Sequence, residues 1–208
     1  MSLAEQAVPG EERVGRVRIL DEAASLFLHQ GYAETSLRHI ASAAGMQAGS
    51  VYYHFASKDE ILEEILRQGI VGVDDAFVTA AAGFGPDACP AERLGSHVRT
   101  HLGALFEHGA YTAAHVTVFH SAPPAVRAAS IPVRDGYEQR WHELLSEIAP
   151  DTDADLTLVR LLLLGAMSSA LEWFDPGGAR TLDDVTDTIV RQTLRGLGVD
   201  HPQPERKP

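Results

Sequence analysis

The side chains best suited to chemistry in this chain are the hydrogen-bonding residues between Thr35 and Lys58. Hydroxyls, an amide, imidazoles and two cations alternate there with small apolar residues. This stretch contains no Asp or Glu, although the chain carries 29 acids in 208 residues. A carboxylate that faces phosphate repels it and loses hydration. The missing acids therefore indicate that this stretch meets a polyanion.

Local signals in the same stretch favour two short helices joined by a tight turn. Thr35 and Ser36 can cap the start of the first helix through their hydroxyls. An apolar stripe follows at helical spacing, formed by Leu37, Ile40, Ala41 and Ala44. Gly45 ends this helix, because glycine adopts a left-handed backbone at little cost. Residues 46–55 then form the second helix, so the pattern predicts a helix-turn-helix whose second helix enters the major groove of DNA.

The polar residues of this motif differ in the group that each can bind. Arg38, Gln47 and Ser50 suit base edges, because Arg and Gln pair bidentately with guanine and adenine. Lys58 and the neighbouring hydroxyls suit phosphate. Tyr52 could belong partly to the core instead. The expected DNA-binding residues are Thr35, Ser36, Arg38, Gln47, Ala48, Ser50, Tyr52, Tyr53, His54 and Lys58.

The sequence around the second helix resembles the signature of the TetR family of transcriptional repressors. The similar segment is residues 49–62, Gly-Ser-Val-Tyr-Tyr-His-Phe-Ala-Ser-Lys-Asp-Glu-Ile-Leu. Upstream, residues 19–31 resemble the family's first helix, with its Ala-x-x-Leu-Phe-x-x-x-Gly-Tyr ending. The resemblance is specific over about residues 16–66. Beyond this range only the expected arrangement of helices resembles the family. It implies a ligand-responsive repressor that binds a palindromic operator as a homodimer.

The family also implies how such a protein is regulated. A ligand favours a body conformation in which the two heads no longer fit successive major grooves. Helices eight and nine of two subunits form a four-helix bundle, so 156–171 and 182–197 are expected at a dimer surface, with the monomer core as the alternative. The Trp173–Gly178 segment resembles the end of helix eight in TetR regulators of lipid and sterol breakdown, some of which sense acyl-CoA thioesters.

The charge distribution agrees with a DNA-binding head on an acidic body. The chain has a formal net charge of −12. Residues 13–58 hold five Lys or Arg against three acids, whereas residues 59–208 hold 12 against 23.

Cys89 is the single cysteine, and the N-terminal residues lack the apolar core of a signal peptide, which suits a cytoplasmic protein. The most apolar run, 161–171, is shorter than the roughly 20 residues of a membrane span and is expected to be a buried helix.

The remaining sequence predicts an all-α fold of about nine helices, because no strand pattern occurs. Expected domains are a disordered N-terminal segment (1–12), a helix-turn-helix domain (13–58), a helical ligand-binding and dimerisation domain (59–198) and a flexible tail (199–208). Expected helices are 14–30, one from Ser57 that continues toward Ala82, and 91–108, 110–120, 133–149, 154–175 and 182–196. The prolines 123, 124 and 132 are expected to separate helices around one short turn.

The body is expected to enclose a mostly apolar cavity with a few polar groups. Its candidate ligand-binding residues are His101, Phe106, Tyr111, His115, Phe119, Tyr137, Trp141, Met167 and Trp173. The same aromatics could instead be ordinary core. The expected effector is an acyl-CoA or a related lipid or sterol metabolite, whose phosphates would need basic residues; the candidates are Arg127, Arg134, Arg140 and Arg180.

Two other classes of function compete with a regulator. His97 and His101 lie four residues apart and could share a metal in a helical metal-dependent enzyme. No cysteine or acidic cluster at ligand spacing accompanies them, and no nucleophile elbow or phosphate loop occurs. No metal, cofactor or catalytic residue is therefore assigned. An architectural DNA-binding protein without a ligand is the other alternative, and it predicts a body without a cavity.

Overall fold

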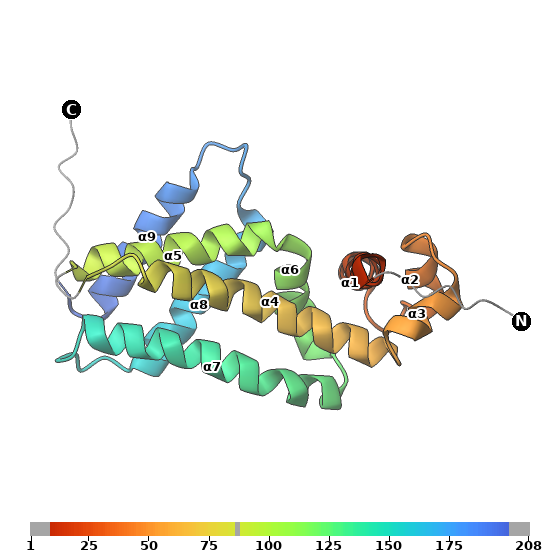
Figure 1. Ribbon diagram of the computed structural model, residues 1–208. Coiled ribbons are helices and arrows are strands. Elements are labelled where there is room, and N and C mark those ends of the chain that lie inside the picture. The colour runs from red at the N-terminus through yellow and green to blue at the C-terminus, as the bar shows by residue number, and fades with distance from the viewer. Residues whose placement is uncertain (1–8, 86–87, 200–208) are drawn as a thin grey trace, which may run out of the picture. The chain divides into compact units, whose positions relative to one another are not determined.

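The computed structural model describes residues 9–85 and 88–199. Within these ranges the chain is all-α, with nine α-helices, one short 3-10 turn and no strand, as predicted. The helices are α1 (Pro9–Gln30), α2 (Leu37–Ala43), α3 (Ala48–His54), α4 (Lys58–Ala81), α5 (Pro90–Glu107), α6 (Gly109–Val118), α7 (Pro124–Ile148), α8 (Leu156–Trp173) and α9 (Leu182–Gly196), with the turn η1 at Phe119–Ser121 (Figure 1).

The helices pack into two compact units. The first, here called the N-terminal unit, comprises the chain up to Gly69 together with Ala110–Pro132. The second, the C-terminal unit, comprises Ile70–Gly109 and the chain from Val133 onward. The helices α4 and α7 therefore each contribute residues to both units.

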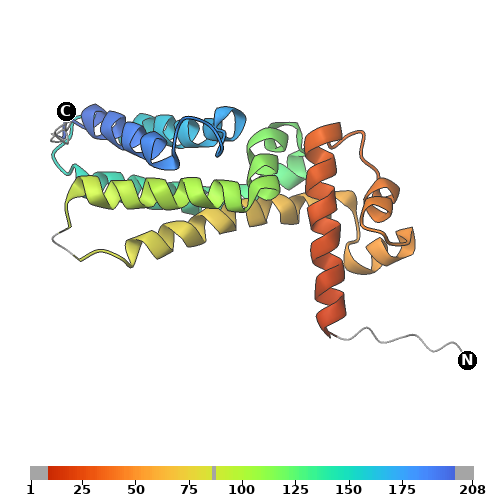
Figure 2. The ribbon, with the colours of Figure 1, turned by 90° about the horizontal axis from the view of Figure 1, so that it is seen from above.

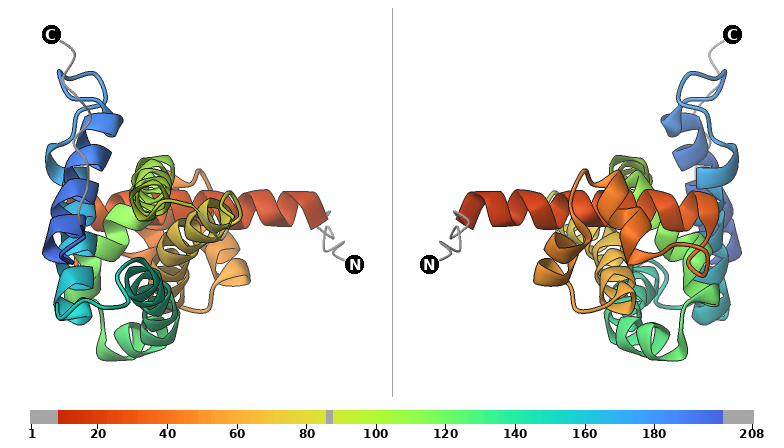
Figure 3. Two further views of the ribbon diagram at one scale, coloured as in Figure 1. Left: turned by 90° about the vertical axis from the view of Figure 1, so that its left-hand side faces the viewer. Right: turned by 90° about the vertical axis from the view of Figure 1, so that its right-hand side faces the viewer.

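The N-terminal unit has a core that combines the first helices with α6 and the start of α7. Phe27 of α1, Val51 of α3 and Leu62 of α4 are almost completely buried there. Val118 and Phe119 pack into the same cluster. The first turns of α1 extend past α2 and α3 (Figure 3). The core fixes α2 and α3 through their apolar stripes and leaves their polar faces outside.

The C-terminal unit is a helical bundle whose core contains Trp141, Leu94, Leu102 and Met167, all with no exposed surface. In this unit α8 and α9 lie side by side next to α5 (Figure 2). The start of α9 is fixed by a capping box, in which the Thr181 hydroxyl accepts from the Asp184 N–H at 3.1 Å and the Asp184 carboxylate accepts from the Thr181 N–H at 2.8 Å.

The region 124–148 differs most from the expectation. One helix, α7, runs through Pro132 instead of ending before it. A proline inside a helix costs about 3 kcal/mol, because it removes one backbone hydrogen bond and clashes with the preceding turn. Both halves of α7 bury side chains, Val126 on one side of Pro132 and Trp141 on the other, and this burial offsets the cost.

The two ends of the described chain differ slightly from the expected bounds. The first helix begins at Pro9, five residues before the expected Val14. Residues 1–8 and 200–208, most of the segments expected to be disordered, lie outside the described ranges. Val199 is described and packs against the core of the C-terminal unit.

Candidate nucleic-acid interface and ligand site

The turn between α2 and α3 is built as the sequence predicts. The Ser36 hydroxyl caps α2 by accepting from the His39 N–H at 3.2 Å. Gly45 has a φ of +64°, which is the left-handed conformation that glycine adopts most easily. The Met46 N–H then donates to the Ala41 carbonyl at 2.8 Å and closes the turn. These bonds fix the angle at which α3 leaves α2.

The outward face of α2 and α3 carries most of the expected contact residues. Val51 and Phe55 are buried, so the opposite side of α3 must face solvent. Tyr52 and Tyr53 are 60% and 69% exposed, which excludes a core role for Tyr52. Ser36, Arg38, Gln47 and Ser50 are also exposed, whereas Ala48 and His54 are partly buried. This face carries hydrogen-bonding groups and no carboxylate.

Thr35 and Lys58 have partners inside the protein. Thr35 is only 2% exposed, and its hydroxyl donates to the Gly31 carbonyl at 2.9 Å. The Lys58 ammonium donates to the carbonyls of Tyr32 and Thr35 at 2.7 and 2.8 Å and lies 4.1 Å from the centre of the Tyr32 ring. Lys58 therefore holds the loop between α1 and α2, a role different from the phosphate contact expected from sequence.

Two arginines that sequence reasoning did not select also support the motif. The Arg16 guanidinium donates to the His54 carbonyl at 3.4 Å and lies 4.3 Å from the centre of the Phe55 ring. Arg18 donates to the Ala44 carbonyl at 3.4 Å. Each cation therefore lies at the carboxyl end of a motif helix, where the helix dipole favours positive charge. The sequence held no local signal for these contacts, because the partners lie 38 and 26 residues away along the chain.

The C-terminal unit contains a buried cluster of aromatic and histidine side chains. We call it the aromatic–histidine cluster, and its members are Phe77, His97, His101, Tyr137 and Trp141. His101 Nδ1 forms a short hydrogen bond with the Tyr137 hydroxyl, and the two rings stack. His97 packs on Phe77 with ring centres 4.2 Å apart. His101 Nε2 and His97 Nδ1 are buried and have no hydrogen-bond partner in the described protein.

Burial keeps this cluster uncharged. It lowers the pKa of His101 to about 3 and that of His97 to about 4, and for His97 the positive charge of Arg93 acts in the same direction. Burial also raises the pKa of Tyr137 far above its ordinary value. The Tyr137 hydroxyl therefore stays protonated and can donate a hydrogen bond to His101 Nδ1. In that tautomer His101 Nε2–H is a buried donor without an acceptor, which is costly unless a ligand supplies one.

The other expected ligand residues are distributed over both units. Tyr111 and Phe119 belong to the N-terminal unit, where the Tyr111 hydroxyl donates to Asp21 at 2.6 Å. His115 lies in the same unit, in ring contact with Phe119. In the C-terminal unit, Phe106 packs on Phe174, Met167 is buried, and Trp173 is 56% exposed. The expected residues are therefore divided between two hydrophobic cores, and their role in ligand binding stays a prediction.

The arginines considered for the effector's phosphates are mostly engaged. Arg127 donates to the Ala122 carbonyl at 2.8 Å, and Arg140 pairs with Asp74 at 2.9 Å. Arg134 pairs with Glu138 at 3.3 Å. Arg180 has Asp184 nearby but makes no close ion pair among the described contacts. The described residues contain no group of three or more metal-ligating side chains.

The chain matches two family models along most of its length. Residues 19–65 match the model described as bacterial regulatory proteins, tetR family. Residues 87–197 match the model of the tetracyclin repressor-like C-terminal domain. The chain belongs to the TetR family. It is therefore a helix-turn-helix transcriptional regulator of the ligand-responsive repressor type and not an enzyme.

Relatives of this TetR-family protein include transcriptional repressors named KstR2. The repressor KstR2 of Mycobacterium tuberculosis is 30% identical over 203 residues, which cover 91% of this chain and 96% of that protein. KstR2 of Rhodococcus jostii is also 30% identical and covers 89% of this chain and 92% of its own length. The solved structure of the M. tuberculosis protein, described as a ketosteroid transcriptional regulator, superposes with a TM-score of 0.66 at 28% identity, over 88% of this chain and 94% of that one.

Other TetR structures share the fold. PfmR of Thermus thermophilus is 30% identical with a TM-score of 0.73, over 86% of this chain and 98% of that one. AibR, solved with isovaleryl coenzyme A and operator DNA, has a TM-score of 0.73 over 86% of this chain and 97% of its own. Its identity of 24% supports the shared fold alone.

In the C-terminal unit of this TetR-family protein, α8 exposes an apolar face. Leu158, Leu161 and Leu162 are 57%, 51% and 75% exposed, although Leu163 and Met167 of the same helix are buried. The expectation that the run 161–171 is simply buried is therefore wrong for this face. With 18 residues and a mean hydropathy of 1.4, α8 also meets the length and composition of a membrane span, a criterion that core helices of soluble proteins meet too.

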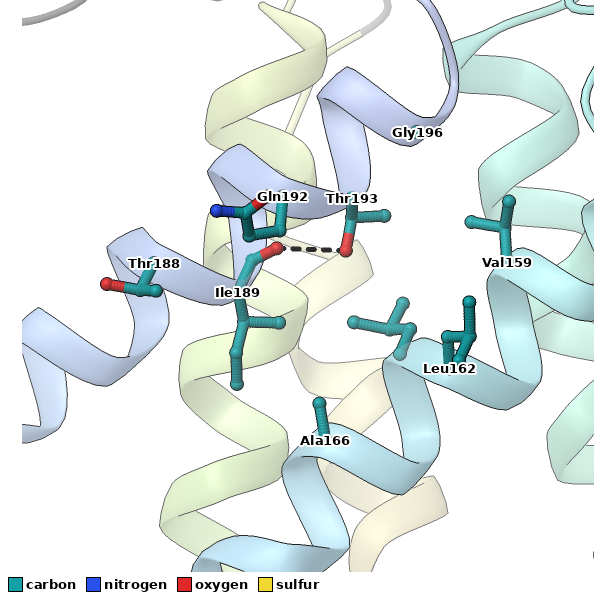
Figure 4. Close-up of a pocket in the computed structure, with 9 residues that line it drawn as sticks. Val159, Leu162, Ala166, Thr188, Ile189, Gln192, Thr193 and Gly196 are labelled. Atoms are coloured by element: carbon teal, nitrogen blue, oxygen red, sulfur yellow. Dashed lines mark hydrogen bonds between the residues drawn. The ribbon is translucent and has the colours of Figure 1, made fainter.

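A groove follows this apolar face between α8 and α9. It has a volume of about 370 Å³ (Figure 4). In Figure 4 Leu162 and Ala166 face Ile189 and Thr193 across it, and the Thr193 hydroxyl donates to the Ile189 carbonyl at 2.9 Å. Exposed leucines beside an apolar groove are typical of a surface that another protein covers.

Proposed function

We propose that this TetR-family protein binds a palindromic operator as a homodimer. The supporting observation is the acid-free, exposed face of α2 and α3 together with the exposed leucines of α8. A helix-turn-helix monomer reads one half-site, so two protomers are needed for a palindrome. The helices α8 and α9 of each protomer would form the interface, with the exposed leucines of α8 filling the partner's groove.

Individual residues have distinct roles in this proposal. Arg38, Gln47 and Ser50 meet base edges, and Ser36 and Tyr53 contact phosphates. Lys58 positions the loop before α2 through its two carbonyl partners. Residues 13–58 are proposed as the DNA-binding domain, and 59–198 as the ligand-binding and dimerisation domain. The protein is proposed to act in the cytoplasm.

The proposed effector is a CoA thioester of an apolar lipid- or sterol-derived acid. The description of the related M. tuberculosis structure as a ketosteroid regulator supports a sterol-derived body, and AibR, which shares the fold, was solved with a CoA thioester. The aromatic–histidine cluster supports an apolar effector body with a hydrogen-bond acceptor, such as a carbonyl, for His101 Nε2–H. Because Arg127, Arg134 and Arg140 have carboxylate or carbonyl partners, Arg180 is the best candidate for the phosphates.

The helices α4 and α7 connect the proposed effector site to the unit that contains the DNA-binding motif, because each helix continues from one unit into the other. Each contributes residues to both units, so a change in the aromatic–histidine cluster alters helices that continue into the N-terminal unit. A coupling of about 1–3 kcal/mol would weaken operator binding by roughly 5–150-fold. The ligand therefore needs to favour one conformation of these helices only modestly.

A titration of the operator complex tests this proposal. Fluorescence anisotropy of labelled operator would be measured with isovaleryl-CoA, a steroid-derived acyl-CoA and free CoA. We expect an acyl-CoA to release the DNA and to raise the melting temperature of the protein, and free CoA to do neither. If no thioester has either effect while an aromatic compound has both, the effector class is wrong but the repressor function stands.

A further inference from the structure

A second pocket lies in the C-terminal unit, away from the groove between α8 and α9. It has a volume of about 440 Å³. Three segments of the unit line it, namely the end of α4 with the loop after it, α5 and the end of α7. The lining residues are Ala81, Phe84, Gly85, Arg93, His97 and Glu147. This size suits a small molecule better than a CoA thioester.

His97 is the buried polar residue of this pocket. It is only 2% exposed, and its Nδ1 has no hydrogen-bond partner among the described residues. Phe77 covers the ring with centres 4.2 Å apart, which holds the imidazole in place. Buried polar atoms in native proteins are nearly always paired with protein, water or ligand. An unpaired imidazole that lines a pocket therefore indicates that a polar group binds beside it.

Arg93 supplies the charge of the pocket. Its guanidinium pairs with Glu147 across α5 and α7, and the two side chains are 26% and 62% exposed. Guanidinium has five N–H donors, so one carboxylate does not satisfy it. An ion pair with an exposed partner contributes little to stability, so Glu147 can move into water at small cost. Arg93 can then bind a carboxylate from a ligand.

The geometry points to a binding site for a small monocarboxylate with a short apolar body. The ligand carboxylate accepts from the Arg93 guanidinium and from an N–H of His97. The apolar body lies against Ala81 and the half-buried Phe84. A phosphate fits less well, because Arg93 is the single cation among the described lining residues and Glu147 repels a dianion.

Isothermal titration calorimetry of the full chain without DNA tests this site. The probe is hexanoate, and hexanamide is the matched uncharged probe. We expect hexanoate to bind with a Kd below about 1 mM and hexanamide at least about tenfold more weakly. Equal affinity for both probes, or no detectable hexanoate binding, would overturn the proposal.

Three variants assign the site to these residues. Arg93→Gln should weaken hexanoate binding by at least about tenfold, because it removes the cation. Glu147→Gln should strengthen it, because it removes the competing carboxylate; loss of folding cannot produce this result. Arg99→Gln is the control, because Arg99 lies on the same helix but pairs with Asp183 outside the pocket. Weaker binding by Glu147→Gln, or unchanged binding by Arg93→Gln, would contradict the assignment.

This test does not depend on the proposed function. It uses no operator DNA and no thioester. If the protein binds hexanoate but no operator, the carboxylate site stands and the repressor function fails. If it binds operator but no hexanoate, the repressor function stands and the carboxylate site fails.

Discussion

At the scale of single residues, Lys58 has a position that suits phosphate but partners inside the protein. Its ammonium donates to the Tyr32 and Thr35 carbonyls. We expect Lys58→Gln to lower the free energy of unfolding by about 1–3 kcal/mol, because two carbonyls lose a charged donor. A plot of log operator affinity against log salt concentration should have the same slope for this variant as for wild type. Loss of a phosphate contact would instead reduce the slope by about one.

Gln47 provides the contrasting variant. It is exposed at the start of α3, and its side chain makes no capping hydrogen bond to the helix that it precedes. We expect Gln47→Ala to leave the free energy of unfolding within about 0.5 kcal/mol and to change which operator sequences bind best. Urea unfolding and competition with variant operators would measure the two effects. Equal loss of affinity for all sequences would remove Gln47 from base recognition.

The two buried histidines make stability depend on pH. Their pKa values in the folded protein are about 4 for His97 and about 3 for His101, against 6.5 in an unfolded chain. Below pH 6.5 the unfolded state binds more protons, so stability falls as pH falls toward these folded values. The slope is about 1.4 kcal/mol per pH unit for each histidine.

The variant His101→Asn separates the contribution of His101 to this pH dependence from the contributions of the other histidines. Urea unfolding at pH 7.5, 6.5, 5.5 and 5.0 would be compared for wild type and His101→Asn. Below pH 6 the variant should lose stability less steeply than wild type, and the two slopes should differ by about 1.4 kcal/mol per pH unit. This difference is expected even if the variant is less stable at pH 7.5. Parallel curves would mean that His101 is protonated in the folded protein.

At the scale of elements, Gly69 permits a close approach of α4 to α6. A Cβ added there would meet the Tyr111 carbonyl oxygen at 2.5 Å, and backbone cannot move aside easily. We expect Gly69→Ala to destabilise the protein by about 1–3 kcal/mol through overpacking. Gly95→Ala in α5 is the matched control, because a Cβ there meets nothing within 4 Å. It should be neutral or stabilising by up to about 1 kcal/mol. Thermal unfolding distinguishes the two.

The elements also show which features a sequence makes predictable. The helix-turn-helix is predictable because its signals are local: Ser36 caps three residues ahead, and Gly45 marks the turn. The partners of Lys58 lie 23 and 26 residues away, and Arg16 reaches across 38 residues, so no local pattern contains them. The continuation of α7 through Pro132 depends on burial of both its halves, which a proline rule does not include.

The candidate ligand site was less predictable than the candidate DNA-binding face for a related reason. Sequence identifies aromatic side chains but not the core to which each belongs. Phe119 is therefore a cavity candidate by sequence, although it packs with the first helices in the N-terminal unit. By sequence, His97 is a candidate metal ligand or a polar lining of an apolar pocket, and its unpaired nitrogen beside a pocket becomes evident only once α4, α5 and α7 are assembled.

At the scale of the whole molecule, the proposed dimer explains the exposed leucines of α8. Leu162→Glu places a charge on a residue that is 75% exposed in one chain and buried in the proposed interface. We expect this variant to sediment as a monomer of 22.4 kDa at micromolar concentration, where the wild type sediments as a dimer. Val78→Glu is the control, because Val78 is 49% exposed on α4. A dimer in both variants would exclude this face.

Operator binding in the presence and absence of effector tests the central claim most directly. DNA from the region beside the protein's own gene would be labelled and titrated with protein, with and without a saturating acyl-CoA. We predict saturable binding of two protomers to one palindromic site, weakened roughly 5–150-fold by the thioester. Binding that shows no preference for any sequence, or that no ligand alters, would contradict a ligand-responsive repressor.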